Sequence, residues 1–526
     1  MPFLVADPTR TLATEALLQG RHHLVEEPAE TLTATFYDTF DWSVFLAGGA
    51  LEWRNAPPRP VLIWSDLTGE RESMTQGAPA EPGFSADLPP GPVRSAMLGV
   101  VGVRRLLPVM GIETSIRSLR LLNEDDKTIA RLRIEDTRYR DPRTGREGDL
   151  APRLHLLPVR GYEAEHAQIA RLLAEEAGLQ SADSRLLLEA LGAAGRRPAD
   201  YSSKLDYRLD PDTRADVATK EILLGLLGTL EANLEGTRAN LDSEFLHDLR
   251  VATRRTRSAL GQIRGVFPGD LVEHFKGEFA WLQQVTGPVR DLDVYLLDFD
   301  TYQQGLPRPL RPHLEPLRRF LLSHYAAEQR RLAETLASER FTRLIRDWRA
   351  FLRSPAVEPV TTINGARPIR AVADERIWTL VKRVRREGRA IRPDSPPEEL
   401  HELRKSSKKL RYLMEFFQSL YPKEEIRGLI GLMKTLLDNL GGYQDLAVQA
   451  AHLKEIARRM REEDHAETDS LLAMGALIGN LLARQQAARD AFDAVFGGFL
   501  AEDNQASLRA LFGPRPAPGR TDGGAP

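Results

Sequence analysis

The chain has 526 residues, of which 42% are hydrophobic and 28% charged, and this length allows two domains of ordinary size. The absence of cysteine excludes disulfides, thiol catalysis and thiolate metal sites, and the formal net charge of −3 means that any site for a polyanion must be a local concentration of positive charge. No apolar run approaches a membrane span and the start, MPFLVADPTR, does not have the pattern of a secretory signal, so we expect a cytoplasmic protein without a membrane partner.

Residues 1–205 have the pattern of an α+β domain with mostly antiparallel strands. Short runs rich in β-branched and aromatic residues are separated by turn-forming segments, and a helical pattern follows them. The expected strands are Thr31 to Tyr37, Arg59 to Trp64, Ile116 to Leu122 and Thr128 to Ile134, and the expected helix is Glu163 to Ala177.

The remainder of the chain contains a tandem duplication. The sequence His247-Asp-Leu-Arg250 reappears as His401-Glu-Leu-Arg404, and GPVRDL from Gly287 reappears as GGYQDL from Gly441, both 154 residues later. Because two separate matches share one offset, we expect a pseudo-symmetric pair of helical units. We place them at about residues 212–350 and 366–500 of an all-α domain spanning 210–505.

Each copy of the His motif lies near an expected helix start. Asp242 stands ahead of the first copy, and Ser395, followed by two prolines, stands ahead of the second. Side-chain oxygens at these positions are typical N-caps, and proline is tolerated in a first helical turn. We interpret the two Gly-to-Leu segments as structural turns, with Asp291 and Asp445 either capping the next helix or pairing with basic residues.

Both expected helices have one basic face opposite an apolar stripe, counting 100° per residue. The basic residues are His247, Arg250, Arg254, Arg255 and Arg257 on the first helix, and His401, Arg404, Lys405, Lys408, Lys409 and Arg411 on the second. For a single helix, a basic face is most often solvated surface. Duplication favours a second interpretation, because two units packed about a pseudo-twofold axis bring their basic faces together across a groove.

Such a groove would require an anion. At an effective dielectric of about 20, like charges roughly 6 Å apart repel by about 3 kcal/mol. Arginine offers a planar fork and lysine a mobile point charge, so the mixture suits a flexible chain of phosphates. The two histidines can donate hydrogen bonds to an anion from the first turns of their helices. They have no Cys, Asp or Glu partners at zinc-site spacing, so we expect no metal there.

These motifs resemble the CHAD domain, the conserved histidine α-helical domain. The resemblance covers roughly Asp210 to Leu500 and rests on HDLRVATRRTRSAL, LQQVTGPVRDLDV, LHELRKSSKKLRY and LLDNLGGYQDL. It implies two antiparallel helical bundles, one per repeat, around a basic cavity that binds inorganic polyphosphate. It also implies that the basic-face residues named above hold the polymer.

Residues 1–205 resemble a diverged CYTH domain, the triphosphate tunnel fold often found ahead of a CHAD domain. The resemblance rests on YDTFDWSVFLAGGALEWR, on Val103 to Leu121 and on ADYSSKL, and it implies a tunnel-like barrel of antiparallel strands. CYTH members that hydrolyse triphosphates open with a Glu-x-Glu-x-Lys strand, which this chain does not have. Arg131, Arg133 and Glu135 share the strand face where acidic residues would hold Mg²⁺. We therefore expect no catalytic residue, metal or cofactor in this domain.

The arginines of this domain have two open interpretations. They can bind phosphate oxygens without a metal, or they can make surface pairs with Glu and Asp of neighbouring strands. The residues concerned are Arg54, Arg117, Arg131 and Arg133.

Three functions remain open at this point. The first is capture of inorganic polyphosphate, which would tether the protein to polyphosphate granules. The second is a metal-dependent triphosphatase or polyphosphatase in the first domain, against which the missing acidic strand argues. The third is nucleic-acid binding, which calls for aromatic residues among the basic ones to stack on bases. Only Tyr412 lies beside a basic residue in this way, so polyphosphate is the expected partner. The oligomeric state stays open, and the Pro/Gly-rich tail, 513–526, is expected to be disordered.

Overall fold

A computed structural model describes residues 2–4, 9–56, 58–68, 70–177, 179–181, 185–205, 207–356, 362–463 and 465–514. Its contacts divide the chain into two compact units, Met1–Ser202 and Ser203–Pro526. The domain limits 1–205 and 210–505 stay predictions. From residue 515 on, the tail expected to be disordered lies outside the described residues.

The first unit is built on an antiparallel sheet. Its ladder order is β11-β1-β10-β8-β7-β3-β4-β5-β6, with β2 paired to β7 and β9 paired to β8. The described pairings leave β11 and β6 unjoined, so a closed tunnel stays a prediction. The strands are β1 (Pro2–Leu4), β2 (His23–Glu26), β3 (Glu30–Asp38), β4 (Gly49–Asn55), β5 (Val61–Asp66), β6 (Met74–Gly77), β7 (Leu107–Leu122), β8 (Thr128–Arg140), β9 (Glu147–Asp149), β10 (Arg153–Pro158) and β11 (Gln180–Ser181).

Alternation of buried and exposed side chains along the strands gives this sheet its core. On β8, Leu132 and Ile134 are fully buried, while the neighbouring Arg131 is exposed. They form one hydrophobic cluster with Ile169 and Leu173 of α4, so this helix covers that part of the sheet. The helices are α1 (Thr9–Gln19), α2 (Ser43–Leu46), η1 (Ser85–Asp87), α3 (Pro92–Val101), α4 (Glu163–Glu175) and α5 (Leu186–Ala193). The expected antiparallel α+β unit is confirmed, and β7 and β8 are longer than predicted.

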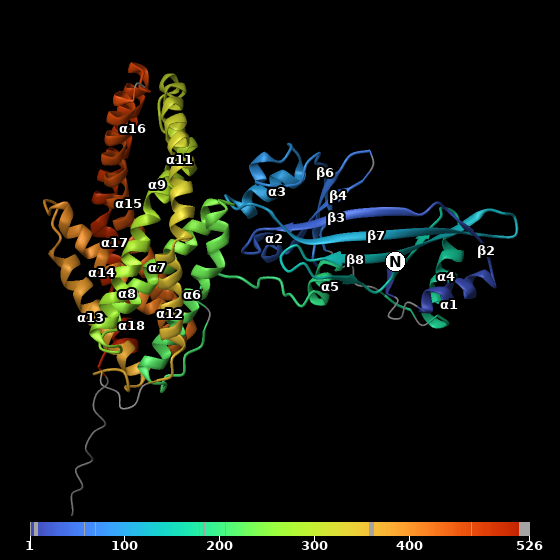
Figure 1. Ribbon diagram of the computed structural model, residues 1–526, viewed down its shortest axis with the longest axis horizontal. Helices are drawn as coiled ribbons and strands as arrows, with labels where there is room; N and C mark the ends of the chain where they lie inside the picture. The colour runs from blue at the N-terminus through green and yellow to red at the C-terminus, as the bar shows by residue number, and fades with distance from the viewer. Residues whose placement is uncertain are drawn as a thin grey trace, which may run out of the picture. The chain divides into compact units, whose positions relative to one another are not determined.

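The described part of the second unit is helical (Figure 1). The helices of the first repeat are α6 (Ala215–Arg238), α7 (Ser243–Gln262), α8 (Gly269–Val285), α9 (Gly287–Leu297), α10 (Phe299–Gln304), η2 (Arg308–Leu310), η3 (Pro312–Leu314), α11 (Glu315–Leu336) and α12 (Glu339–Arg353). Those of the second repeat are α13 (Ile369–Ala390), α14 (Pro397–Phe416), η4 (Gln418–Leu420), α15 (Lys423–Glu462), α16 (Thr468–Asp490), α17 (Phe492–Leu500) and α18 (Glu502–Phe512). The expected all-helical C-terminal unit is confirmed. No described helix combines the length and apolar character that a bilayer crossing needs.

The two repeats share one hydrophobic core. A single cluster of buried side chains includes Leu249 and Trp348 of the first repeat and Leu403 and Phe416 of the second. A second cluster joins residues of α9, α10, α11, α15 and α16, towards the end of the unit where α11 and α16 are labelled in Figure 1. Because the main core crosses the repeat boundary, removal of either repeat would expose apolar surface of the other.

The two predicted helix starts have different outcomes. The Asp242 side chain accepts hydrogen bonds from the backbone N–H groups of Glu244 and Phe245, at 2.9 and 3.3 Å, so its capping role is confirmed. The prediction for Ser395 is wrong, because α14 begins after Pro396 and this helix has no side-chain cap. The Ser395 hydroxyl instead donates to the Glu399 carboxylate at 2.6 Å.

The interpretation of the two Gly-to-Leu segments as turns is also wrong. Residues 287–292 lie inside α9. Residues 441–446 lie inside α15, an unbroken helix of 40 residues. In the first repeat the corresponding chain ends α8 at Val285 and starts α9 at Gly287. The repeats therefore differ in structure directly beside the basic helices.

One tight contact predicts a stability effect. A Cβ atom on Gly388 of α13 would overlap the ring of Phe496 on α17. We expect Gly388→Ala to lower the free energy of unfolding by about 2 kcal/mol, because overpacking forces its neighbours to shift. Gly428→Ala is the matched control: this helical glycine is exposed with open space around it, and alanine there should stabilise the helix by up to about 1 kcal/mol. Urea unfolding of the full chain, followed by helical circular dichroism, measures both changes, and equal midpoints for the two variants would contradict the prediction.

Candidate functional site

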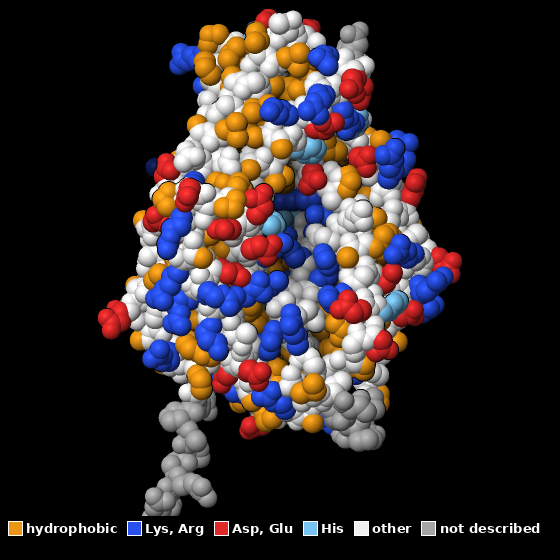
Figure 2. Space-filling view, turned by 90° about the vertical axis from the view of Figure 1, so that its left-hand side faces the viewer, with side chains coloured by type: hydrophobic (Ala, Val, Ile, Leu, Met, Phe, Trp, Pro, Cys, Tyr) orange, Lys and Arg blue, Asp and Glu red, His pale blue; other side chains and the backbone are white. Residues whose placement is uncertain are grey.

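The basic faces of α7 and α14 meet within the second unit. Arg254 donates from Nε to the Tyr412 hydroxyl at 2.8 Å, and Arg255 bridges to the Glu415 carboxylate at 3.0 Å. These contacts join the first repeat to the second. Figure 2 shows one side of the molecule, with a hollow near its middle where Lys and Arg side chains gather.

A cavity of about 330 Å³ opens beside α14, between this helix and α15. Its lining residues are Arg404, Lys408, Arg411, Lys434, Leu437, Asp438, Gly441, Gly442 and Asp445. Four of them are cations and two are carboxylates, so the lining is positively charged. Neither Lys434 nor Asp438 was predicted from the sequence.

The two arginines of the cavity lining use only some of their hydrogen-bond donors on protein acceptors. Arg404 donates to both carboxylate oxygens of Asp445 at 2.9 Å, and Arg411 donates to Glu415 at 2.9 Å. The Nε atoms of Arg404 and Arg411 are buried and have no hydrogen-bond partner among the described residues. A buried donor without a partner is costly, and an acceptor from a ligand would remove that cost.

Lys408 is a half-buried cation of the cavity lining. Burial lowers its pKa to about 8, and the nearby charges of Arg404 and Arg254 lower it further. Asp445 opposes this effect. Because Arg254 belongs to α7, the charges of the two repeats act on one another at this point, and an anion here would favour the charged form of Lys408.

Arg250 has a structural partner instead. Its guanidinium donates to the Gln283 carbonyl at 2.8 Å and to the Thr286 hydroxyl at 2.7 Å, at the end of α8. The last carbonyls of a helix have no partner within the helix, and Arg250 donates to acceptors at the end of α8. In the second repeat α15 continues through the corresponding position, so it offers no such acceptors there. Burial lowers the pKa of Arg250 to about 10.

The other predicted site residues do not line the cavity. Lys405 pairs with Glu402 at 2.7 Å on the exposed side of α14. Burial, and then the charge of Arg383, lowers the pKa of Lys409. The remaining three, which are half-buried, are His247, Arg257 and His401. Among the described atoms, Nδ1 of His401 is buried and has no hydrogen-bond partner.

The arginines of the first unit are held by carboxylates. Arg117 donates to Glu15 at 3.1 Å and to Glu26 at 3.0 Å. The other three pairs are Arg54 with Glu52 at 2.7 Å, Arg131 with Glu27 at 3.6 Å and Arg133 with Glu135 at 2.9 Å. This geometry matches the interpretation of these arginines as surface pairs. Within the ranges that the structure describes, no group of three or more His, Asp or Glu residues is placed to hold a metal ion.

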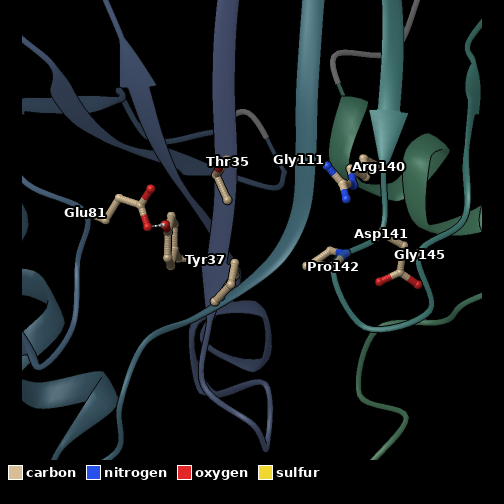
Figure 3. A pocket seen from close by; sticks show the side chains of 9 residues that line it. Thr35, Tyr37, Glu81, Gly111, Arg140, Asp141, Pro142 and Gly145 are labelled. Carbon is tan, nitrogen blue, oxygen red and sulfur yellow. Dashed lines mark hydrogen bonds between the residues drawn. The ribbon is translucent and has the colours of Figure 1, made fainter.

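A second cavity, also of about 330 Å³, lies in the first unit (Figure 3). Tyr37 of β3 donates to Glu81 at 2.8 Å on one side, and Arg140 at the end of β8 lies on the other. Asp141 in its lining already accepts hydrogen bonds from the Thr144 hydroxyl and from Arg196. With one basic side chain in its lining, this cavity is a weaker candidate for a polyanion than the cavity beside α14.

Comparison with known proteins concerns mainly the helical unit. The sequence model of the CHAD domain family matches residues 221–454. The chain is similar to the crystal structure of the CHAD domain from the plant Ricinus communis, with 24% identity and a TM-score of 0.47 over 56% of this chain and 95% of that chain. It is also similar to PptA from Streptomyces chartreusis, with 17% identity and a TM-score of 0.42 over 54% and 100% of the two chains.

A third similar structure is a Hippeastrum protein described as an adenylyl cyclase with a dominant triphosphatase activity. Its identity is 13% and its TM-score 0.26, over 38% of this chain and 97% of that chain. Among curated proteins, no sequence matches this chain.

Proposed function

Residues 221–454 form a CHAD domain, and we propose that this domain binds inorganic polyphosphate along the basic faces of α7 and α14. The observation that carries the proposal is the cavity beside α14, where four cations meet two carboxylates. Burial lowers the pKa of Lys408 there, and the surrounding cations lower it further. A chain of phosphates would offset this repulsion and supply acceptors to Arg404 and Arg411.

Bare phosphate fits the site better than nucleic acid. A protein that binds single strands without sequence preference stacks bases on accessible aromatic rings. Tyr412, the aromatic residue nearest the basic faces in sequence, is 4% exposed, and its hydroxyl accepts a hydrogen bond from Arg254. Its ring therefore offers no platform for a base.

The predicted binding residues divide into three groups under this proposal. Arg254, Arg404, Lys408 and Arg411 contact the polymer, whereas Arg250 contributes mainly by holding the end of α8. The others, His247, Arg255, Arg257, His401, Lys405 and Lys409, extend the positive potential along the two helices. Capture of long polymer would tether the protein to polyphosphate granules. We also keep the proposal that the first unit is a diverged, non-catalytic CYTH-like domain.

Titration with long-chain polyphosphate tests this function. By analogy with single-stranded nucleic acid, a plot of the logarithm of the association constant against the logarithm of the salt concentration should have a slope near −0.7Z when Z phosphates are neutralised. For four contacts we expect a slope of about −3. Single-stranded DNA of equal charge should compete poorly. Binding that is insensitive to salt, or that DNA displaces at equal concentration, would contradict the proposal.

A further inference from the structure

The cavity beside α14 belongs to one repeat. Three of its cations, Arg404, Lys408 and Arg411, come from α14, and Lys434 comes from α15. None of its lining residues comes from the first repeat. The duplication predicts two equivalent halves, so the residues at the equivalent positions of the first repeat decide whether that repeat can hold the same ligand.

Two differences set the repeats apart at these positions. The position 154 residues before Lys434 is Ala280, so α8 carries no charge there. The helix break at Thr286 gives Arg250 two acceptors at the end of α8, whereas α15 continues through the corresponding position. Arg404, the counterpart of Arg250, therefore pairs with Asp445 at the cavity and keeps an unsatisfied Nε.

The carboxylate of Asp445 lies in the cavity lining beside Arg404. It is 61% exposed, while Arg404 is 13% exposed. Because water already solvates most of the Asp445 carboxylate, its release from Arg404 leaves no carboxylate buried, and a phosphate oxygen can replace it as the partner of the guanidinium. Arg404 can therefore pass from an internal partner to a ligand without leaving a buried charge unpaired.

We propose that the second repeat alone anchors a short stretch of linear condensed phosphate in this cavity, and that Lys434 is one of its binding residues. This inference rests on the proposed polyphosphate-binding function. Ligand cavities span about 300 to 1,000 Å³, so a volume of about 330 Å³ suits a short phosphate chain rather than a long polymer. A long polymer fills the cavity with one stretch and continues past Arg254 of the first repeat.

Tripolyphosphate and long-chain polyphosphate distinguish the two parts of the site. We compare four variants of the full chain: Arg411→Gln, Lys434→Ala, Arg257→Gln, which is the same exchange 154 residues earlier, and Lys454→Ala, an exposed lysine elsewhere on α15. Arg411→Gln and Lys434→Ala should each raise the Kd for tripolyphosphate by roughly tenfold. Arg257→Gln should weaken long-chain polyphosphate more than tripolyphosphate, and Lys454→Ala should change neither Kd by more than about twofold.

Two results would overturn the inference. One is an Arg257→Gln variant that loses tripolyphosphate as strongly as Arg411→Gln does, and the other is a Lys434→Ala variant that behaves like Lys454→Ala. In either case wild-type protein still binds long-chain polyphosphate, so the proposed function stands. Failure of the wild type to bind long-chain polyphosphate is a different result and removes the function itself.

Discussion

Replacing Arg254 and Lys408 together by alanine is expected to weaken binding of long-chain polyphosphate by about a hundredfold. A hydrogen bond to a charged group contributes about 1.5 to 3 kcal/mol, and 1.4 kcal/mol corresponds to tenfold in affinity, so each lost contact should cost at least about tenfold. The two residues come from α7 and α14, and their charges act on one another. The double variant therefore tests whether one polymer engages both repeats. Fluorescence titration at constant salt measures the change.

A second double variant separates the effect of local contacts from the effect of the protein's net charge. Lys423→Ala with Lys454→Ala removes two exposed lysines of α15, so both double variants change the formal net charge from −3 to −5. We expect this control to stay within about twofold of wild type, because exposed charges beyond a Debye length are screened. Equal losses in the two double variants would mean that polyphosphate responds to net charge alone. The basic faces would then be ordinary solvated surface.

The sequence predicted features that depend on local chemistry. Asp242 caps α7 because its side-chain oxygen reaches the first free N–H groups of the helix, a contact that spans only three residues. Arg404, Lys408 and Arg411 share one face because helical periodicity fixes it. The period-two pattern of β8 likewise gave its buried and exposed faces, although its far end extends to Arg140.

Features that depend on packing between helices were not predictable in this way. Lys434 lies on a helix without a basic pattern, and it reaches the cavity only because α15 packs against α14. Gly441 and Gly442 disfavour a helix by up to about 1 kcal/mol each, which suggested a turn. Burial of Leu440 and Tyr443 in the shared core outweighs that preference, and α15 continues. The same continuity gives Arg404 a role different from that of Arg250.

Polyphosphate affinity is expected to fall with rising pH, by about eightfold between about pH 7.5 and about pH 9. The cause is Lys408, whose pKa of about 8 means that the free protein loses this charge across that interval. Bound phosphate raises the pKa of Lys408, because an opposite charge favours the protonated amine. Binding at the upper end of the interval should therefore take up a proton. Calorimetric titrations in two buffers of different ionisation enthalpy measure that uptake, and the interval lies above the ordinary histidine and phosphate ranges, near 6.5 and 6.

Two conservative exchanges identify the group that titrates. Lys408→Arg keeps the positive charge at every pH of the experiment, because an arginine loses its proton only above about pH 12. We expect this variant to bind with little pH dependence, whereas Lys434→Arg, the same exchange at the other lysine of the cavity lining, should keep the wild-type fall. If Lys408→Arg retains the full eightfold loss, a group other than Lys408 governs binding. The lowered pKa of Lys408 would then reflect its burial beside Arg404 and Arg254 and no contact with the polymer.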